Sequence, residues 1–186
     1  MKVNGNINCD GESGLNSLAG GGSGGSLILE IGTLLGYGLI SCNGGNGGQY
    51  DNNGIGKGGG GGGGRIIIEL TDRSYNNEVY NNFSGIVSTY GGTGFQIASS
   101  GTIFIQKNID NKIHNILIIK NNNQTFLPTV ITKSYKNDIN ELNILGYSYV
   151  TINLLSNNSY HNNGKYFYLN KIIGDATGEF YIFNCF

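Results

Sequence analysis

Seven consecutive glycines at positions 58–64 stand directly before a strand-like apolar run, in the stretch GKGGGGGGGRIIIEL at residues 56–70. A backbone without Cβ atoms has two structural uses that fit this place in the chain. It can lie close against a neighbouring backbone, where a side chain would keep the two apart. It can also belong to a flexible insertion, here NGGNGGQYDNNGIGKGGGGGGG at residues 43–64. The sequence is equally consistent with close packing and with a flexible loop for this glycine run.

The stretch at 56–70 belongs to a series. GGSGGSLILEIGT at residues 21–33 and ASSGTIFIQKN at 98–108 have the same form, and Ser26, Arg65 and Thr102 occupy equivalent places, 39 and 37 residues apart. A second β-like segment and an Asn/Gly turn follow each copy, namely GLISCNGG, SGIVSTYGG and HNILIIKNNN. We therefore predict three diverged strand–loop–strand repeats in residues 1–123. Further β-strand segments in residues 124–186 are expected to continue the same domain.

The pattern of apolar residues predicts an all-β fold. Apolar residues recur with period two or in short runs rich in isoleucine and tyrosine, and glycine interrupts every longer stretch. Repeats that each expose an apolar stripe bury it by stacking on one another. We therefore predict a right-handed parallel β-helix, with residues 26–30, 65–69 and 102–106 as adjacent parallel strands in register. A β-sandwich is the alternative.

Aligning the repeats also predicts which face of each strand is buried. The expected core positions are Leu27, Leu29, Ile66, Ile68, Ile103 and Ile105. Since side chains alternate along a strand, Ile28, Ile67 and Phe104 point the other way and form a second apolar ladder. This ladder is either covered by a glycine-rich or C-terminal segment of the chain or serves as an interaction face.

Candidate catalytic groups are few. The alignment places Glu30, Glu69 and Gln106 at one strand position, so Glu30 and Glu69 form a weak carboxylate pair; two solvated glutamates near Arg65 or Lys57 are the simpler interpretation. Asp72 and Arg73 lie close by in the sequence. His114 and His161 belong to no recognised catalytic pattern, and we interpret them as solvated side chains. We expect no catalytic residues, no cofactor and no metal site.

The chain has three cysteines, Cys9, Cys42 and Cys185, with no CxxC pair. The odd number and the lack of a metal-ligand spacing favour buried thiols, and a Cys9–Cys42 disulfide is the alternative.

The repeats resemble the glycine-rich β-helical repeat regions of very large predicted adhesin-like surface proteins of bacteria and protists. GGSGGSLILEIGTLLGYGLISCNGGNG, GGGGGGRIIIELTD, SGIVSTYGG and SGTIFIQ carry the resemblance, and ILGYSYVTINLL and LNKIIGDATGEFYI resemble the segments that follow in such chains. This chain departs from the pattern by having asparagine, isoleucine, lysine and tyrosine where those repeats prefer smaller residues. The resemblance implies an extracellular or cell-surface location and a structural or adhesive role.

The charge and hydropathy of the chain limit the kinds of partner that it can have. A net charge of −1 with 12% charged residues provides no basic field for nucleic acid, and no stretch is long and apolar enough for a membrane-spanning helix. We expect a non-enzymatic stiff spacer or contact surface for a glycan or protein, flanked by neighbouring repeats of a longer polypeptide. A carbohydrate-active β-helix, either polysaccharide lyase or hydrolase, is the alternative.

Overall fold

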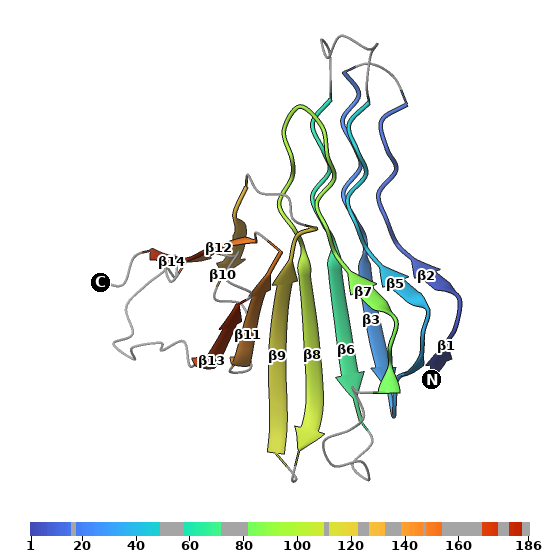
Figure 1. Ribbon diagram of the computed structural model, residues 1–186, viewed down its shortest axis with the longest axis vertical. Helices are drawn as coiled ribbons and strands as arrows, with labels where there is room; N and C mark the ends of the chain where they lie inside the picture. Colours follow the sequence, from blue (N-terminus) through green and yellow to red (C-terminus); the bar gives the residue numbers. More distant parts are fainter. Residues whose placement is uncertain are drawn as a thin grey trace, which may run out of the picture.

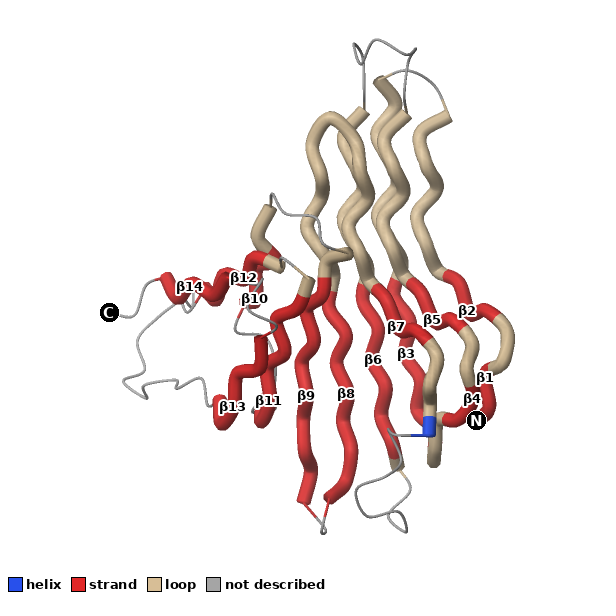
Figure 2. Tube along the Cα trace, viewed as in Figure 1, coloured by secondary structure: helices blue, strands red, loops and turns tan. Residues whose placement is uncertain are grey.

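The computed structural model describes residues 1–15, 18–48, 58–71, 82–109, 112–122, 127–132, 139–146, 148–153, 169–174 and 179–183. Within these ranges the chain consists of strands and extended segments, and the only helical residue is Asn82, in a 3₁₀ turn. The all-β prediction is therefore confirmed (Figures 1 and 2).

The strands of the described residues form four sheets. A six-stranded sheet has the order β13-β11-β9-β8-β6-β3, and three smaller sheets have the orders β2-β5-β7, β10-β12-β14 and β1-β4. The bounds are β1 Lys2–Val3, β2 Asn6–Asn8, β3 Ser26–Ile31, β4 Leu35–Gly36, β5 Leu39–Ser41, β6 Arg65–Leu70, β7 Ile86–Ser88, β8 Thr102–Ile109, β9 Lys112–Lys120, β10 Thr129–Thr132, β11 Ile139–Leu145, β12 Tyr149–Asn153, β13 Leu169–Gly174 and β14 Glu179–Phe183.

The predicted stacking of the three glycine-associated strands is confirmed. β3, β6 and β8 are parallel neighbours, and Ser26, Arg65 and Thr102 are register partners as the alignment requires. The chain returns to a second parallel sheet between them, so that β2, β5 and β7 also stack in order. Each passage of the chain through one strand of the β2-β5-β7 sheet and then one strand of the six-stranded sheet is called a coil below. The first coil contains β2 and β3, the second β5 and β6, and the third β7 and β8.

The stacking does not continue through the whole chain. β8 and β9 pair antiparallel, whereas β9, β11 and β13 are parallel to one another. The sheets are therefore mixed and do not close, and the continuous parallel β-helix predicted from the repeats is not shown. The physical reason is the connection: β8 ends at Ile109 and β9 begins at Lys112. So short a connection can form a hairpin, whereas a parallel crossover needs a dozen or more residues.

The third predicted repeat consequently differs from the other two. Its second segment, HNILIIKNNN, was expected to match GLISCNGG and SGIVSTYGG, which contain β5 and β7. It forms β9 instead and joins the six-stranded sheet rather than stacking on β7. The similarity between these segments reflects strand composition, which does not specify a pairing partner.

Two apolar cores lie on opposite faces of the six-stranded sheet. The first core lies between strands β3, β6 and β8 on one side and the β2-β5-β7 sheet on the other, and it includes Ile40, Ile66, Ile68, Ile103 and Ile105. The second core involves β9 to β12, and includes Leu117, Ile119, Ile131, Leu142 and Val150. β9 serves both cores, because Ile116 and Ile118 belong to the first and Leu117 and Ile119 to the second. Of the predicted core residues, Ile66, Ile68 and Ile105 are fully buried, and Ile103 nearly so.

The glycine-rich segments project beyond the strands as a bundle of extended chains (Figures 1 and 2). Three outgoing segments, 9–15, 42–48 and 89–94, follow β2, β5 and β7. Three returning segments, 19–25, 58–64 and 96–101, lead into β3, β6 and β8. These six segments are called the glycine bundle.

Candidate contact surface

The two glutamates selected from the sequence lie opposite one another on neighbouring strands. Glu30 of β3 is the register partner of Glu69 of β6, and Gln106 of β8 is the third member of the row. Glu30 is exposed and Glu69 is half-buried. The Gln106 Nε2 atom donates a hydrogen bond to Asn115 Oδ1 over 3.0 Å. The row therefore brings together two carboxylates and a neutral amide.

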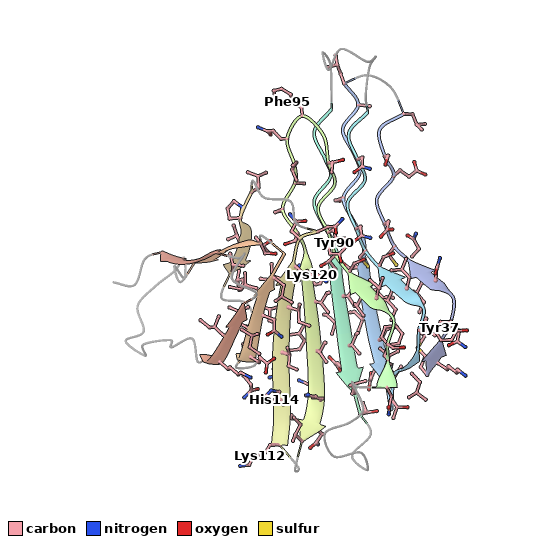
Figure 3. All side chains as sticks on the ribbon, viewed as in Figure 1. Tyr37, Tyr90, Phe95, Lys112, His114 and Lys120 are labelled. Carbon is pink, nitrogen blue, oxygen red and sulfur yellow. The ribbon has the colours of Figure 1, made fainter. Side chains whose placement is uncertain are left out.

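The other candidate polar residues lie elsewhere or outside the described part of the chain. His114 lies on β9 opposite Lys107, towards the end of the strand that is far from the glycine bundle (Figure 3). Lys57, Asp72, Arg73 and His161 lie outside the described residues. Within the described part of the chain, no three His, Cys, Asp or Glu side chains cluster so as to hold a metal ion.

The predicted apolar ladder has a gradient of exposure. Ile28, Ile67 and Phe104 are register partners on one sheet face. Ile28 is 67% exposed, Ile67 is half-buried, and Phe104 packs against the second core. The C-terminal strands thus cover one end of the ladder and leave Ile28 exposed at the other.

The glycine bundle is held together by backbone hydrogen bonds that recur every third residue. Gly11 and Gly14 donate to Asn43 and Asn46 of the second outgoing segment, and the same spacing continues from the second segment to the third. Gly58, Gly61 and Gly64 donate to residues 48, 45 and 42, across the two layers. An extended chain with three residues per turn, bonded to its neighbours and not to itself, has the pattern of a polyproline II helix.

The glycines are required by close approach of neighbouring chains. A Cβ atom built on Gly60, Gly61, Gly63 or Gly64 would lie 2.0–2.1 Å from a carbonyl oxygen of another segment, whereas one on Gly59 or Gly62 would meet nothing within 4 Å. Two positions in every three therefore face a neighbouring backbone, and the third faces outwards. For residues 58–64 the close-packing interpretation of the glycines is correct, while 49–57 lie outside the described residues.

Outward positions of the outgoing segments carry a ladder of polar side chains. Asn43 Oδ1 accepts a hydrogen bond from the Tyr90 backbone N–H over 2.8 Å. Asn46 Oδ1 accepts from both the N–H and the Oγ1 of Thr93, over 2.9 and 2.8 Å. Asp10 and Ser13 of the first segment do the same for the backbone N–H groups of Asn43 and Asn46. Each side chain thus pairs an outward backbone donor of the next segment.

This ladder was not predicted from the sequence, although the sequence contains a signal for it. NGGNGG at residues 43–48 and GGSGGS at 21–26 place a non-glycine residue at every third position. We interpreted the Asn/Gly clusters as turns, because αL turns are the more common use of these residues. A period of three instead indicates polyproline II packing.

Large apolar side chains are exposed at the tips of the bundle. Leu15 ends the first outgoing segment and is 92% exposed, and Leu18 directly precedes the first returning segment and is 72% exposed. Phe95, between the two segments of the third pair, is 78% exposed. Figure 3 shows Phe95 at the end of its pair, beyond Tyr90. Leu18 also has φ of 68°, in the left-handed region, where a bulky side chain is strained and glycine is not. We call Leu15, Leu18 and Phe95 the apical residues.

Cys9 and Cys42 meet where the strands β2 and β5 pass into the glycine bundle. They follow the register partners Asn8 and Ser41, and both are free thiols. Burial, reinforced by the neighbouring Cys9 and then by Asp10, raises the pKa of Cys42 to about 12. The buried-thiol interpretation therefore describes Cys42, and Cys185 lies outside the described residues.

Comparisons with known proteins identify no relative. No family model, no curated protein and no solved structure matches the chain. Among the described residues, no helix has the length and apolar character needed to cross a membrane.

Proposed function

We propose that the chain is a non-enzymatic structural or adhesive segment of a large surface or secreted protein. In this proposal the glycine bundle is a stiff spacer, and the apical residues form the contact surface for a glycan or protein. The fold that we propose for the first three coils is a short right-handed parallel β-helix, supported by the parallel stacking of β2, β5 and β7 and of β3, β6 and β8.

One observation supports this proposal most directly. Backbone hydrogen bonds connect the six extended segments along their length, and exposed apolar side chains stand at their far end. Such cross-linking resists bending, because each segment is held by neighbours in its own layer and in the other layer. The strained conformation of Leu18 supports a contact role, since an exposed leucine at φ of 68° costs stability that glycine would not.

Binding measurements with apical variants test the contact role. The protein is immobilised and screened against a glycan array and against intact cells, and the triple variant Leu15→Ser, Leu18→Ser, Phe95→Ser should lose at least about tenfold in affinity, the equivalent of 1.4 kcal/mol. The matched control replaces Tyr37 and Ile86 by serine, since both are exposed but lie away from the apical residues, Tyr37 between β4 and β5 and Ile86 at the start of β7. Equal loss in both variants, or full binding by the apical variant, would contradict the proposal.

Leu18→Gly separates binding from stability. It relieves the backbone strain and removes the side chain at once, so the variant should unfold at the same or a higher temperature while it binds more weakly. Lower stability together with unchanged binding would show that Leu18 has a structural role only.

The alternative function, a polysaccharide lyase or hydrolase, rests on the paired positions of Glu30 and Glu69. General acid–base catalysis needs several positioned groups, and this row supplies two carboxylates and a neutral amide. We therefore expect no release of reducing sugar and no unsaturated product from a panel of polysaccharides. Release that is abolished by Glu69→Gln would establish the enzymatic alternative instead.

A further inference from the structure

The two ends of the stack of coils differ in how their hydrogen-bonding groups are paired. In the second coil, the N–H of Gly44 donates to the following outgoing segment. Gly91 is the equivalent residue of the third coil, and its N–H donates instead to Asn121 Oδ1 over 3.1 Å. Asn121 Nδ2 bonds the carbonyl of Ala98, and Thr129 Oγ1 donates to the carbonyl of Ser100 over 2.7 Å. Side chains of the C-terminal part thus close this end.

Among the described residues, no side chain closes the first coil in this way on its returning side. Gly59 and Gly62 of the second coil each accept a hydrogen bond from the first coil, from the N–H groups of Gly21 and Gly24. The equivalent carbonyls of the first coil belong to Gly20 and Ser23, and no described backbone N–H donates to them. This edge therefore presents carbonyl acceptors at the same three-residue spacing at which the first and second coils are hydrogen-bonded to each other.

The strand that follows continues the open edge. Among the described strands β3 pairs with β6 alone, and Arg65 N–H donates to Gly25 O. Because donors and acceptors of successive residues alternate between the two sides of a strand, the N–H groups of Ser26, Ile28 and Glu30 point away from β6. An unpaired strand edge of this kind is a template for another strand.

The core is also incomplete at this edge. Leu27 and Leu29 of β3 are only partly buried, whereas their register partners Ile66 and Ile68 have 0% exposure. Ile28, on the other face, is 67% exposed. The first coil therefore lacks the neighbour that buries the equivalent side chains of the second coil.

We propose that the edge formed by residues 20–31 is a docking surface for a glycine-rich coil of another protein chain. The partner segment has glycine at the two inward positions of every three residues, followed by an alternating apolar strand. It lies parallel to residues 20–31 and donates N–H groups to Gly20 and Ser23, adding a strand to β3. This contact repeats the interface between the first and second coils, which supplies its geometry.

A second copy of the same chain fits the edge less well. Stacking head to tail would need the donor end of the third coil, which Asn121 and Thr129 close. Two-fold pairing of β3 with β3 would be antiparallel, so the glycine segments of the two copies would project in opposite directions. The carbonyls of Gly20 and Ser23 would then stay unpaired.

The probe is a synthetic peptide that duplicates residues 19–33 and is titrated into the full chain to millimolar concentration. Amide hydrogen exchange of Ser26, Ile28 and Glu30 should slow at least about tenfold, because their N–H groups become hydrogen-bonded. In the control peptide, valine replaces the copies of Gly21 and Gly24. A Cβ on Gly24 lies 2.2 Å from the carbonyl oxygen of Cys42 in the existing interface, so this peptide should give no protection.

A covalent form of the probe tests the geometry at high effective concentration. Lys2 is the register partner of Leu35, so Met1 holds the same place in the first coil that Leu34 holds in the next. A second copy of residues 19–33 joined ahead of Met1 therefore reaches β3 through the same kind of connection as the one from Thr33 to Leu34. The fusion should raise the unfolding midpoint by about 3 °C or more over the fusion with the two valines. Ile28→Pro, which removes a donor on the open side, should abolish the gain, whereas Ile28→Thr should keep most of it.

The outcomes decide the proposal. Protection by the free peptide, absent with the valine peptide, supports it. Protection only in the fusion overturns the claim that a separate chain docks here, and no protection in either overturns the edge as a docking surface. Dimerisation of the chain alone that Ile28→Pro abolishes would identify a second copy as the occupant, and would also overturn it.

Discussion

The carbonyl oxygen of Gly22 lies 2.0 Å from the place that a Cβ atom on Gly61 would occupy, while a Cβ on the adjacent Gly62 would meet nothing within 4 Å. No side chain fits at the first position, whereas a Cβ atom fits at the second. The inward and outward positions of the glycine bundle can therefore be separated by single substitutions.

We predict that Gly61→Ala strongly destabilises the protein and that Gly62→Ala does not. The alanine methyl group at 61 must displace the backbone of the first returning segment, an overpacking effect that costs about 1–3 kcal/mol or more. At 62, alanine restricts the unfolded chain without a clash and should be neutral or stabilising by about 0.4–1 kcal/mol. Denaturant midpoints measure both, and similar losses at the two positions would rule out the three-residue packing pattern.

Truncating the isoleucines of β6 should distinguish its two faces. Ile66 and Ile68 have 0% exposure and lie between apolar register partners on both sides. Replacing either by alanine leaves a cavity and should cost about 2–5 kcal/mol. Ile67→Ala should cost less, because Ile67 is only half-buried. Equilibrium unfolding in urea gives the three values, and equal losses would show that Ile67 is as well packed as its neighbours.

The polar ladder should contribute measurably to the stability of the bundle. Asn46→Ala removes the acceptor for both the N–H and the hydroxyl of Thr93 and should cost about 0.5–1.5 kcal/mol. Asn46→Asp keeps an acceptor oxygen and should cost less. Thermal unfolding of the two variants compares them, and an alanine variant as stable as the wild type would mean that water replaces the bond at no cost.

The buried thiol of Cys42 should make stability depend on pH in the alkaline range. Its pKa is raised from 9.0 to about 12, so the folded state favours the neutral thiol. This contribution to stability is complete below pH 9 and is lost as the pH rises towards 12. The free energy of unfolding should therefore fall faster above pH 9 in the wild type than in Cys42→Ala. Parallel curves for the two proteins would contradict the assigned pKa.

Alkylation of the native protein provides an independent check on Cys42. Because the thiolate is the nucleophile, iodoacetamide should modify Cys42 much more slowly at pH 8 than it modifies a free cysteine. Cys42→Ala identifies the modified site in the mass spectrum. Rapid modification of Cys42 in the folded protein would show that its thiol is accessible and ionised.

The sequence by itself determined the stacked strands β3, β6 and β8 of the first three coils. Period-two apolar residues require strands, and the recurrence of a small residue before each strand gave the register of Ser26, Arg65 and Thr102, which the structure confirms. Burial of Ile66 and Ile68 followed from the same alignment. These features are set by interactions within a strand and between equivalent residues of similar repeats.

Only the tertiary structure decided the remainder. The antiparallel direction of β9 depends on how it pairs with β8, and apolar composition alone does not reveal it. Which glycines face a backbone depends on six segments meeting from different parts of the chain, so it is a property of their packing. The exposure of Ile28 and the burial of Phe104 likewise depend on which strand is added at each end of the sheet. A strand's alternation fixes two faces, but the element that covers each face is chosen by the complete fold.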